Sequence, residues 1–221
     1  MRILLVIDTL GPGGAEDVFV ELATATISDP RHSCLAMVPG PGWIAAALAS
    51  RGVAVEFAPF SGSFSLKYLR AIIGAVRAHR IDVIHSHLLG ASLYASLAGL
   101  ATGVPVIATF HGAVDIRPGV RFVGIKGAVL RRAARLVAVS GELKGYLVRR
   151  LRLGADEVAV VPNGIDVARF LDATPADVRS DYGIPPTARL IGSVGNIRHA
   201  KAYDVGLRAL RALRDAGVDA H

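Results

Sequence analysis

The sequence has little cysteine, few aromatic residues and little charge. Cys34 is its one cysteine, which excludes a disulfide framework and a cysteine-based metal site and favours a reducing, cytoplasmic compartment. Aromatic residues make up 6% and charged residues 19%, against 52% hydrophobic residues, so the chain can bury a sizeable core that is not an aromatic-rich β-sandwich. The first apolar run ends at Asp8 and is too short for a signal peptide.

Residues 88–110 contain no charged residue, a length that in principle crosses a bilayer. Gly103 and Pro105 interrupt this run, and alanine, serine, threonine and glycine dilute its hydrophobicity. We therefore predict a buried helix, a turn and a buried strand here rather than a membrane span.

Short apolar runs alternate with longer helical patterns along most of the chain. Strands are predicted at residues 2–7, 33–38, 53–58, 82–87, 105–109, 135–139 and 157–161. Helices are predicted at residues 15–27, 43–50, 66–79, 91–101, 121–133 and 142–152. This alternation predicts right-handed crossovers and a doubly wound, parallel, Rossmann-like α/β sheet covered on both faces.

A second strand-helix start lies near the end of the sequence. Residues 173–186 are rich in proline and resemble a linker; a strand at 188–191, a glycine-rich turn and a helix at 203–216 follow. We therefore predict a domain over residues 1–172 and an incomplete second domain over residues 173–221. One strand and one helix do not bury a core, so the second part should be poorly stabilised by itself.

Small and polar residues gather at the carboxyl ends of the predicted strands, where doubly wound sheets bind ligands. They are Gly13, Gly14, His85, His87, His111, Asp115, Ser140 and Asn163. A glycine turn that leads into a helix exposes backbone N–H groups and suits a phosphate. Gly13-Gly14 nevertheless lacks the last glycine of the dinucleotide fingerprint and the Gly-Lys-Ser/Thr of a P-loop, which disfavours an NAD-dependent oxidoreductase.

The second glycine-rich turn, residues 192–201, adds two cations, Arg198 and Lys201, beside its predicted anion position. Two such turns in one chain suggest two nucleotide-type domains that share a ligand.

Three histidines fall near the same edge of the predicted sheet. His85 and His87 lie two apart on one strand, so both rings point to one side, where His111 can join them. This leaves a metal-dependent hydrolase open as a hypothesis, although few carboxylates lie nearby. We favour His85 as a packed strand residue, and His87 and His111 as pocket residues that donate a hydrogen bond or polarise a leaving oxygen. Ser140 is better explained as a helix cap than as a nucleophile.

Residues 117–152 are strongly basic, with ten lysines and arginines against one acid, Glu142. The basic residues are Arg117, Arg121, Lys126, Arg131, Arg132, Arg135, Lys144, Arg149, Arg150 and Arg152. They form either an ordinary solvated surface or a peripheral contact with the inner face of an anionic membrane. No aromatic side chains are arranged among them as a stacking platform, so nucleic acid is not expected as a partner.

Five short motifs resemble, in order, the landmarks of family 4 glycosyltransferases. They are Gly13-Gly14-Ala15-Glu16, Phe110-His111-Gly112, Val139-Ser140, residues 161–166 and residues 194–201. The resemblance implies a retaining enzyme of the GT-B fold, which moves a sugar from a nucleotide-diphosphate sugar to an acceptor (a glycan, lipid or small molecule). It spans the N-terminal, acceptor-side domain and the first βα unit of the C-terminal, donor-binding domain.

The resemblance also implies roles for individual residues. His111 would contact the transferring sugar, and Arg198 and Lys201 would neutralise the charge that grows on the leaving nucleoside diphosphate. Donor or acceptor binding falls to Gly13, Gly14, His87, Asn163 and Asn196. Family members generally need no metal, so neither a metal nor a cofactor is expected beside the nucleotide-sugar donor.

Two residues depart from the family pattern. Asn196 stands where many relatives carry an arginine, and Ala202 replaces the glycine that usually follows the lysine. The paired glutamates that grip the donor in the family's C-terminal domain are absent from these 221 residues, so we expect this chain alone to be an inactive fragment. The alternative is a non-catalytic Rossmann-like module that binds a phosphorylated ligand or an anionic membrane.

Overall fold

The computed structural model describes residues 1–60, 65–113, 116, 123–165, 167–172, 174–197 and 199–221. The predicted site residue Arg198 lies outside the described residues, as do Asp115 and, in the basic stretch, Arg117 and Arg121. The chain forms two compact units, Met1–Gly164 and Ile165–His221.

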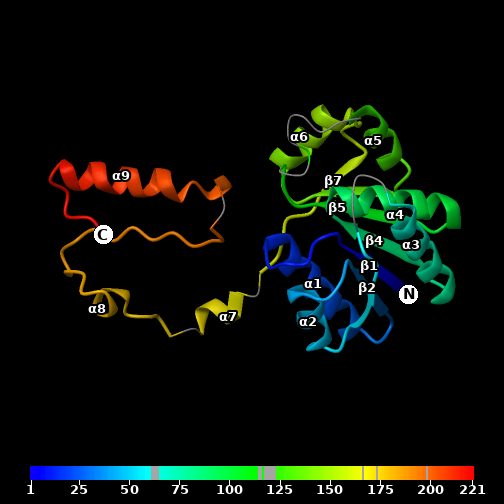
Figure 1. Cartoon of the computed structure of the whole chain (residues 1–221), viewed down its shortest axis with the longest axis horizontal. Coiled ribbons are helices and arrows are strands. Elements are labelled where there is room, and N and C mark those ends of the chain that lie inside the picture. Colours follow the sequence, from blue (N-terminus) through cyan, green and yellow to red (C-terminus); the bar gives the residue numbers. More distant parts are fainter. Residues whose placement is uncertain (61–64, 114–115, 117–122, 166, 173, 198) are drawn as a thin grey trace. The chain divides into compact units, whose positions relative to one another are not determined.

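Seven parallel strands form the sheet of the first unit, in the order β3-β2-β1-β4-β5-β6-β7 (Figure 1). They are β1 (Arg2–Val6), β2 (Ser33–Val38), β3 (Ala54–Phe57), β4 (Val83–His87), β5 (Val106–Phe110), β6 (Arg135–Ala138) and β7 (Val158–Val160). This confirms the predicted doubly wound, Rossmann-like α/β sheet. The strand order reverses between β1 and β4, and the loops after these two strands diverge at the place where such sheets bind ligands.

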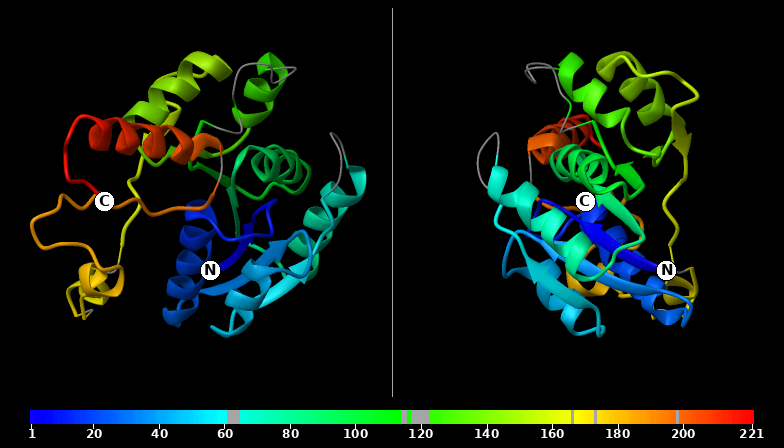
Figure 2. Two further views of the ribbon diagram at one scale, coloured as in Figure 1. Left: turned by 60° about the vertical axis from the view of Figure 1, so that its left-hand side comes forward. Right: turned by 90° about the vertical axis from the view of Figure 1, so that its right-hand side faces the viewer.

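Helices pack on both faces of this sheet (Figure 2). On one face, α1 (Gly14–Ser28) and α2 (Trp43–Ala49) cover β1 and β2. On the other lie α3 (Leu66–Ala78), α4 (Leu89–Thr102), α5 (Val123–Leu130) and α6 (Gly141–Leu151).

The prediction that both faces are covered holds for only part of the sheet. On the face that carries α1 and α2, Val137 of β6 is half-buried and Ala159 of β7 is exposed. Among the described residues of the first unit, helices therefore cover this end of the sheet on one face only. The reason is that strands β4 to β7 follow one another in one direction, so right-handed crossovers place α4, α5 and α6 on the same side.

The uncharged run of residues 88–110 folds as predicted, into the buried helix α4, a turn and the buried strand β5. Gly103 ends α4 in the left-handed region at φ 76°, a conformation that glycine adopts without a steric penalty. Among the described residues, no helix is both long and apolar enough to cross a membrane.

The second unit holds α7 (Val167–Leu171), α8 (Val178–Asp181), the 3₁₀ turn η2 (His199–Lys201) and α9 (Tyr203–Asp215). The strand predicted at residues 188–191 is wrong: the described residues form a single parallel bridge there, between Arg189 and Ala220. Backbone bonds from Ile191 N to His221 O (2.7 Å) and from His221 N to Arg189 O (2.9 Å) continue this pairing. A strand needs an extended partner, and among the described residues only 219–221 supply one.

Candidate functional site

Asp8 links the two loops at the strand-order reversal. It follows β1, and its Oδ2 accepts a hydrogen bond from the backbone N–H of Ala91, in the first turn of α4 (2.9 Å). A Cβ on Gly90 would collide with this carboxylate, so the absence of a side chain at position 90 allows the close approach. The positive end of the α4 dipole is thereby neutralised by a carboxylate of the chain itself.

Glu16 lies in the first turn of α1, where Gly13 and Gly14 were predicted to bind a ligand, and its negative charge offsets the positive end of that helix dipole. Its carboxylate folds back over Gly13, where a Cβ would meet Glu16 Oε2, and its Oε1 accepts a hydrogen bond from Thr9 Oγ1 (2.8 Å). Sequence reasoning missed Glu16 as a site residue, although an acid in the third position of a helix is a known N-terminal signal. Gly14 has open space around it within 4 Å.

The structure brings the three histidines together on the face that carries α1. His85 Nε2 lies 2.8 Å from Thr109 Oγ1, and the ring centroids of His85 and His87 lie 4.6 Å apart with the rings tilted by 34°. His87 Nδ1 and His111 Nε2 share a hydrogen bond of 2.9 Å, and their rings lie at 16° to one another. Phe19 of α1 packs edge-on against His87, 5.2 Å between ring centroids, which leaves His87 only 1% exposed.

Burial keeps these histidines neutral near pH 7. It lowers the pKa of His85 to about 4, with a smaller contribution from His111. It holds the pKa of His87 well below the ordinary value, helped by His85 and His111. The pKa of His111 is also lowered by burial, and the nearby Glu16 carboxylate offsets part of this effect.

His111 also lines a cavity of about 260 Å³ at the carboxyl ends of β5 and β6. Its other lining residues are Gly112, Ala113, Val139, Ser140, Glu142, Leu143 and Tyr146. Ser140 accepts a hydrogen bond from Leu143 N (3.1 Å) at the start of α6, which confirms its role as a helix cap. The cavity therefore places a neutral histidine beside polar and apolar walls, an arrangement suited to a hydroxylated ligand.

The remaining predicted binding residues lie at exposed positions. Asn163 follows β7, and Asn196 and Lys201 lie in the second unit, all three exposed. A Cβ on Gly195 would come within 2.9 Å of Tyr203 Oη and 3.5 Å of Lys201 Cε, so these two side chains flank the glycine turn.

Ala202 begins α9 in the left-handed region, at φ 49°. This conformation explains why a glycine is favoured here, because a Cβ is strained at such a φ.

The described residues offer no group of three or more His, Cys, Asp or Glu side chains arranged to hold a metal ion. Cys34 is buried, and burial raises the pKa of its thiol to about 12, so it is no nucleophile near neutral pH. The three-histidine hydrolase therefore gains no support from this geometry.

Two solved structures share the fold at low sequence identity. A glycosyltransferase from Rickettsia africae superposes with a TM-score of 0.70 at 21% identity, over 86% of this chain and 51% of that one. HepE from Anabaena, solved in complex with UDP, superposes with a TM-score of 0.76 at 19% identity, over 95% of this chain and 57% of that one.

Together with the strand order, these likenesses define a Rossmann-like α/β protein of the GT-B type. The chain belongs to Glycosyltransferase Family 4, whose profile matches residues 12–169. A D-inositol 3-phosphate glycosyltransferase from Streptomyces scabiei is 31% identical over 163 residues, 67% of this chain and 36% of that protein. Another from Actinosynnema mirum is 30% identical over 184 residues, 72% of this chain and 44% of that protein. The chain thus spans less than half of these two relatives.

Proposed function

We propose that Met1–Gly164 is the acceptor-side domain of a retaining glycosyltransferase that uses a nucleotide-diphosphate sugar. The observation that supports this most directly is the hydrogen-bonded His87–His111 pair beside a cavity of about 260 Å³, in a chain of Glycosyltransferase Family 4. In this proposal His111 donates a hydrogen bond to a sugar oxygen near the reacting carbon.

The two carboxylates at the strand-order reversal favour an acceptor over a diphosphate in this unit. Asp8 and Glu16 lie at the N-termini of α4 and α1, the positions that an anionic ligand would otherwise use. A diphosphate brought there would meet two like charges, whereas the hydroxyl groups of a sugar or polyol can donate hydrogen bonds to carboxylates. Gly13 and Gly14 would then allow an acceptor close to the backbone.

We assign the donor diphosphate to the second unit. Lys201 and Tyr203 flank the Gly195 turn just before α9, a helix of 13 residues, and Arg198 and Asn196 belong to the same turn by sequence. Cations there would offset the charge that develops on the leaving nucleoside diphosphate. The HepE structure contains UDP, which supports a uridine nucleotide as the first donor to test.

We further propose that these 221 residues alone transfer no sugar. The test combines UDP release from UDP-glucose with NMR titrations of the isotope-labelled chain by UDP-glucose and by myo-inositol. We expect no UDP release above background, shifts at His111 and Glu16 with myo-inositol, and shifts around Lys201 with UDP-glucose. His111→Ala should abolish the first set of shifts.

The matched control is His79→Ala, because His79 is exposed and paired with Glu56 (2.7 Å) away from the cavity. UDP release by the chain would contradict the proposed inactivity. Shifts at Gly13 and Gly14 with UDP-glucose and none near Lys201 would contradict the division of roles. If the product of the complete native gene also releases no UDP, a non-catalytic binding module becomes the better account.

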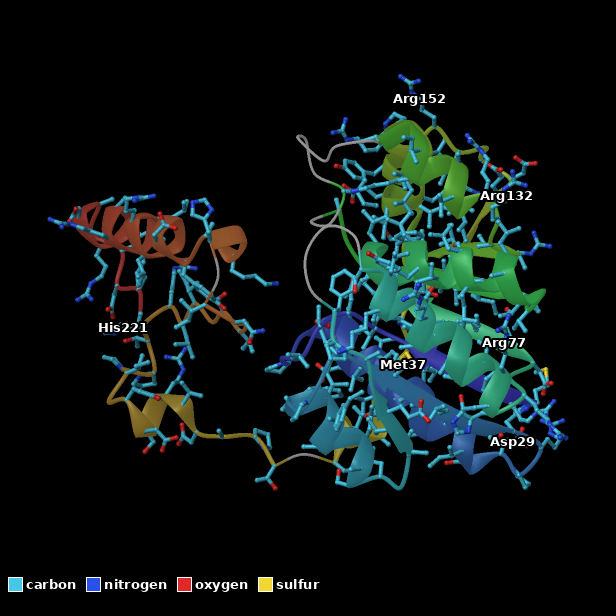
Figure 3. The ribbon with its side chains drawn as sticks, turned by 45° about the vertical axis from the view of Figure 1, so that its right-hand side comes forward. Asp29, Met37, Arg77, Arg132, Arg152 and His221 are labelled. Atoms are coloured by element: carbon cyan, nitrogen blue, oxygen red, sulfur yellow. The ribbon has the colours of Figure 1, made fainter. Side chains whose placement is uncertain are left out.

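The basic stretch supports a second proposal, peripheral contact with anionic lipid. Arg131 and Arg132 follow α5, and Arg149 and Arg152 lie at the end of α6; all four are exposed. The Arg131 guanidinium donates to the backbone carbonyl of Arg152, so these two helix ends lie together, and Figure 3 shows Arg132 and Arg152 extending outward.

Vesicle co-sedimentation tests this contact. Binding to phosphatidylglycerol vesicles should fall as salt rises, because the Debye length shortens from about 30 Å at 0.01 M to about 8 Å at 0.15 M. Arg132→Glu combined with Arg152→Glu should weaken binding, whereas Arg77→Glu on α3 serves as the control. Equal binding to neutral and anionic vesicles would rule the contact out.

A further inference from the structure

The bond between His87 and His111 joins two adjacent strands at their carboxyl ends. His87 is the last residue of β4 and pairs in register with Thr109 of β5, two residues before His111. The His87 ring is enclosed by the rings of His85, His111 and Phe19. A side chain so tightly packed cannot reorient freely, so it presents a fixed Nδ1 to its neighbour.

Such a bond requires one ring to donate and the other to accept. Both rings are neutral near pH 7, and a neutral imidazole carries one N–H and one bare nitrogen. Two arrangements satisfy the 2.9 Å distance. Either His87 Nδ1–H donates to His111 Nε2, or His111 Nε2–H donates to His87 Nδ1.

The two nitrogens outside the bond decide between these arrangements. His87 Nε2 and His111 Nδ1 are both covered, and neither has a hydrogen-bond partner within the described residues. A buried N–H without an acceptor is rarer in proteins than a buried acceptor without a donor. His87 is enclosed on all sides at 1% exposure, whereas His111 is half-buried and lines the cavity. The unpartnered proton is therefore less costly on His111.

We propose that His87 is a positioning residue, which donates from Nδ1 to His111 Nε2 and thereby fixes His111 in the tautomer that carries its proton on Nδ1. The proposal gives His87 an indirect role in place of the ligand contact predicted from the sequence. Its consequence for transfer rests on the proposed function of His111. The one remaining proton of His111 then lies on Nδ1, which is covered in the free chain and has no competing acceptor, so a sugar oxygen that accepts it must first displace the atoms that cover it.

The test is NMR of the chain labelled with ¹⁵N-histidine, since imidazole nitrogen shifts distinguish a protonated from a bare nitrogen. In the wild type we expect one form of His111, protonated on Nδ1, throughout the range where it stays neutral. Among the described residues, the titratable groups that act on these three histidines are Glu16, His85 and His111.

Three variants separate positioning from packing. His87→Phe keeps a ring beside Phe19 but donates no hydrogen bond, so both tautomers of His111 should become populated. His87→Asn places an amide N–H near the former Nδ1 and should restore the single form. His85→Phe alters the neighbouring ring without touching the bond and is the matched control.

A wild-type His111 protonated on Nε2, or a single Nδ1–H form that survives in His87→Phe, would overturn the proposal. If His87→Phe does not fold, the wild-type spectrum and His87→Asn still decide it. Titration with myo-inositol separates this result from the proposed function. A fixed tautomer without ligand shifts refutes the ligand role of His111 alone, and ligand shifts with an unfixed tautomer refute the positioning role alone.

Discussion

Lowering the pH from about 6.5 to about 4 should destabilise the first unit, because its buried histidines resist protonation. Most of this range lies above the pH at which the carboxylates of the unit are protonated. His85 has a pKa of about 4 in the folded state, against an ordinary value of 6.5. Between these values the unfolded chain binds a proton that the folded chain excludes, so stability rises with pH across this window. The stabilisation is complete above about pH 6.5 and is lost as pH falls toward 4.

The magnitude follows from the size of the shift. A depression of this size lowers the free energy of unfolding by about 2 kcal/mol at pH 5 and about 3 kcal/mol at pH 4, from His85 alone. His87 and His111 act in the same direction. The pKa values of Asp29 and Asp82 are lowered to about 2 by Arg31 and Arg2, so the losses from these acids fall below this window.

Urea unfolding at several pH values between 7 and 4.5 measures this effect, with the fluorescence of Trp43, the one tryptophan, as the signal from the first unit. His85→Gln keeps a polar group near Thr109 Oγ1 but cannot titrate, so its loss of stability at pH 5 should be smaller by about 2 kcal/mol. His79→Gln controls for the loss of an exposed histidine. An unfolding free energy that is equal at pH 7 and pH 5 would refute the reasoning.

Three further substitutions test the packing and the helix ends. Gly127→Ala should cost about 3 kcal/mol in urea unfolding, because its Cβ would strike the backbone carbonyl of Leu151, whereas Gly124→Ala on the same helix meets open space and should not destabilise; equal effects would contradict this contact. Ala202→Gly should stabilise the start of α9 by about 1 kcal/mol, seen as slower amide exchange there, and faster exchange would count against the strained φ of 49°. Ser140→Ala should cost about 1 kcal/mol through the lost cap of α6, with Ser140→Asp largely restoring it, and an unchanged unfolding midpoint would exclude this role.

Local sequence patterns predicted the seven strands of the first unit to within one or two residues at each end. Apolar runs, glycines and prolines act within a few residues, so they reveal where a strand or helix begins and ends. The strand predicted at residues 188–191 was wrong because a strand forms only against an extended partner, and a local pattern does not reveal whether that partner is present. The departure at Ala202 was visible in the sequence, but its physical reason, a left-handed φ, needed the structure.

By itself the sequence determined the alternation of strands and helices, the family motifs and the placing of His85, His87 and His111 near one edge. Only the tertiary structure decided which groups meet there. The order of β1, β4 and β5 in the sheet brings Asp8 to the start of α4 and His87 to His111. These contacts join residues that are far apart in the chain, and hydrogen-bond geometry depends on strand order and register, which no local pattern encodes.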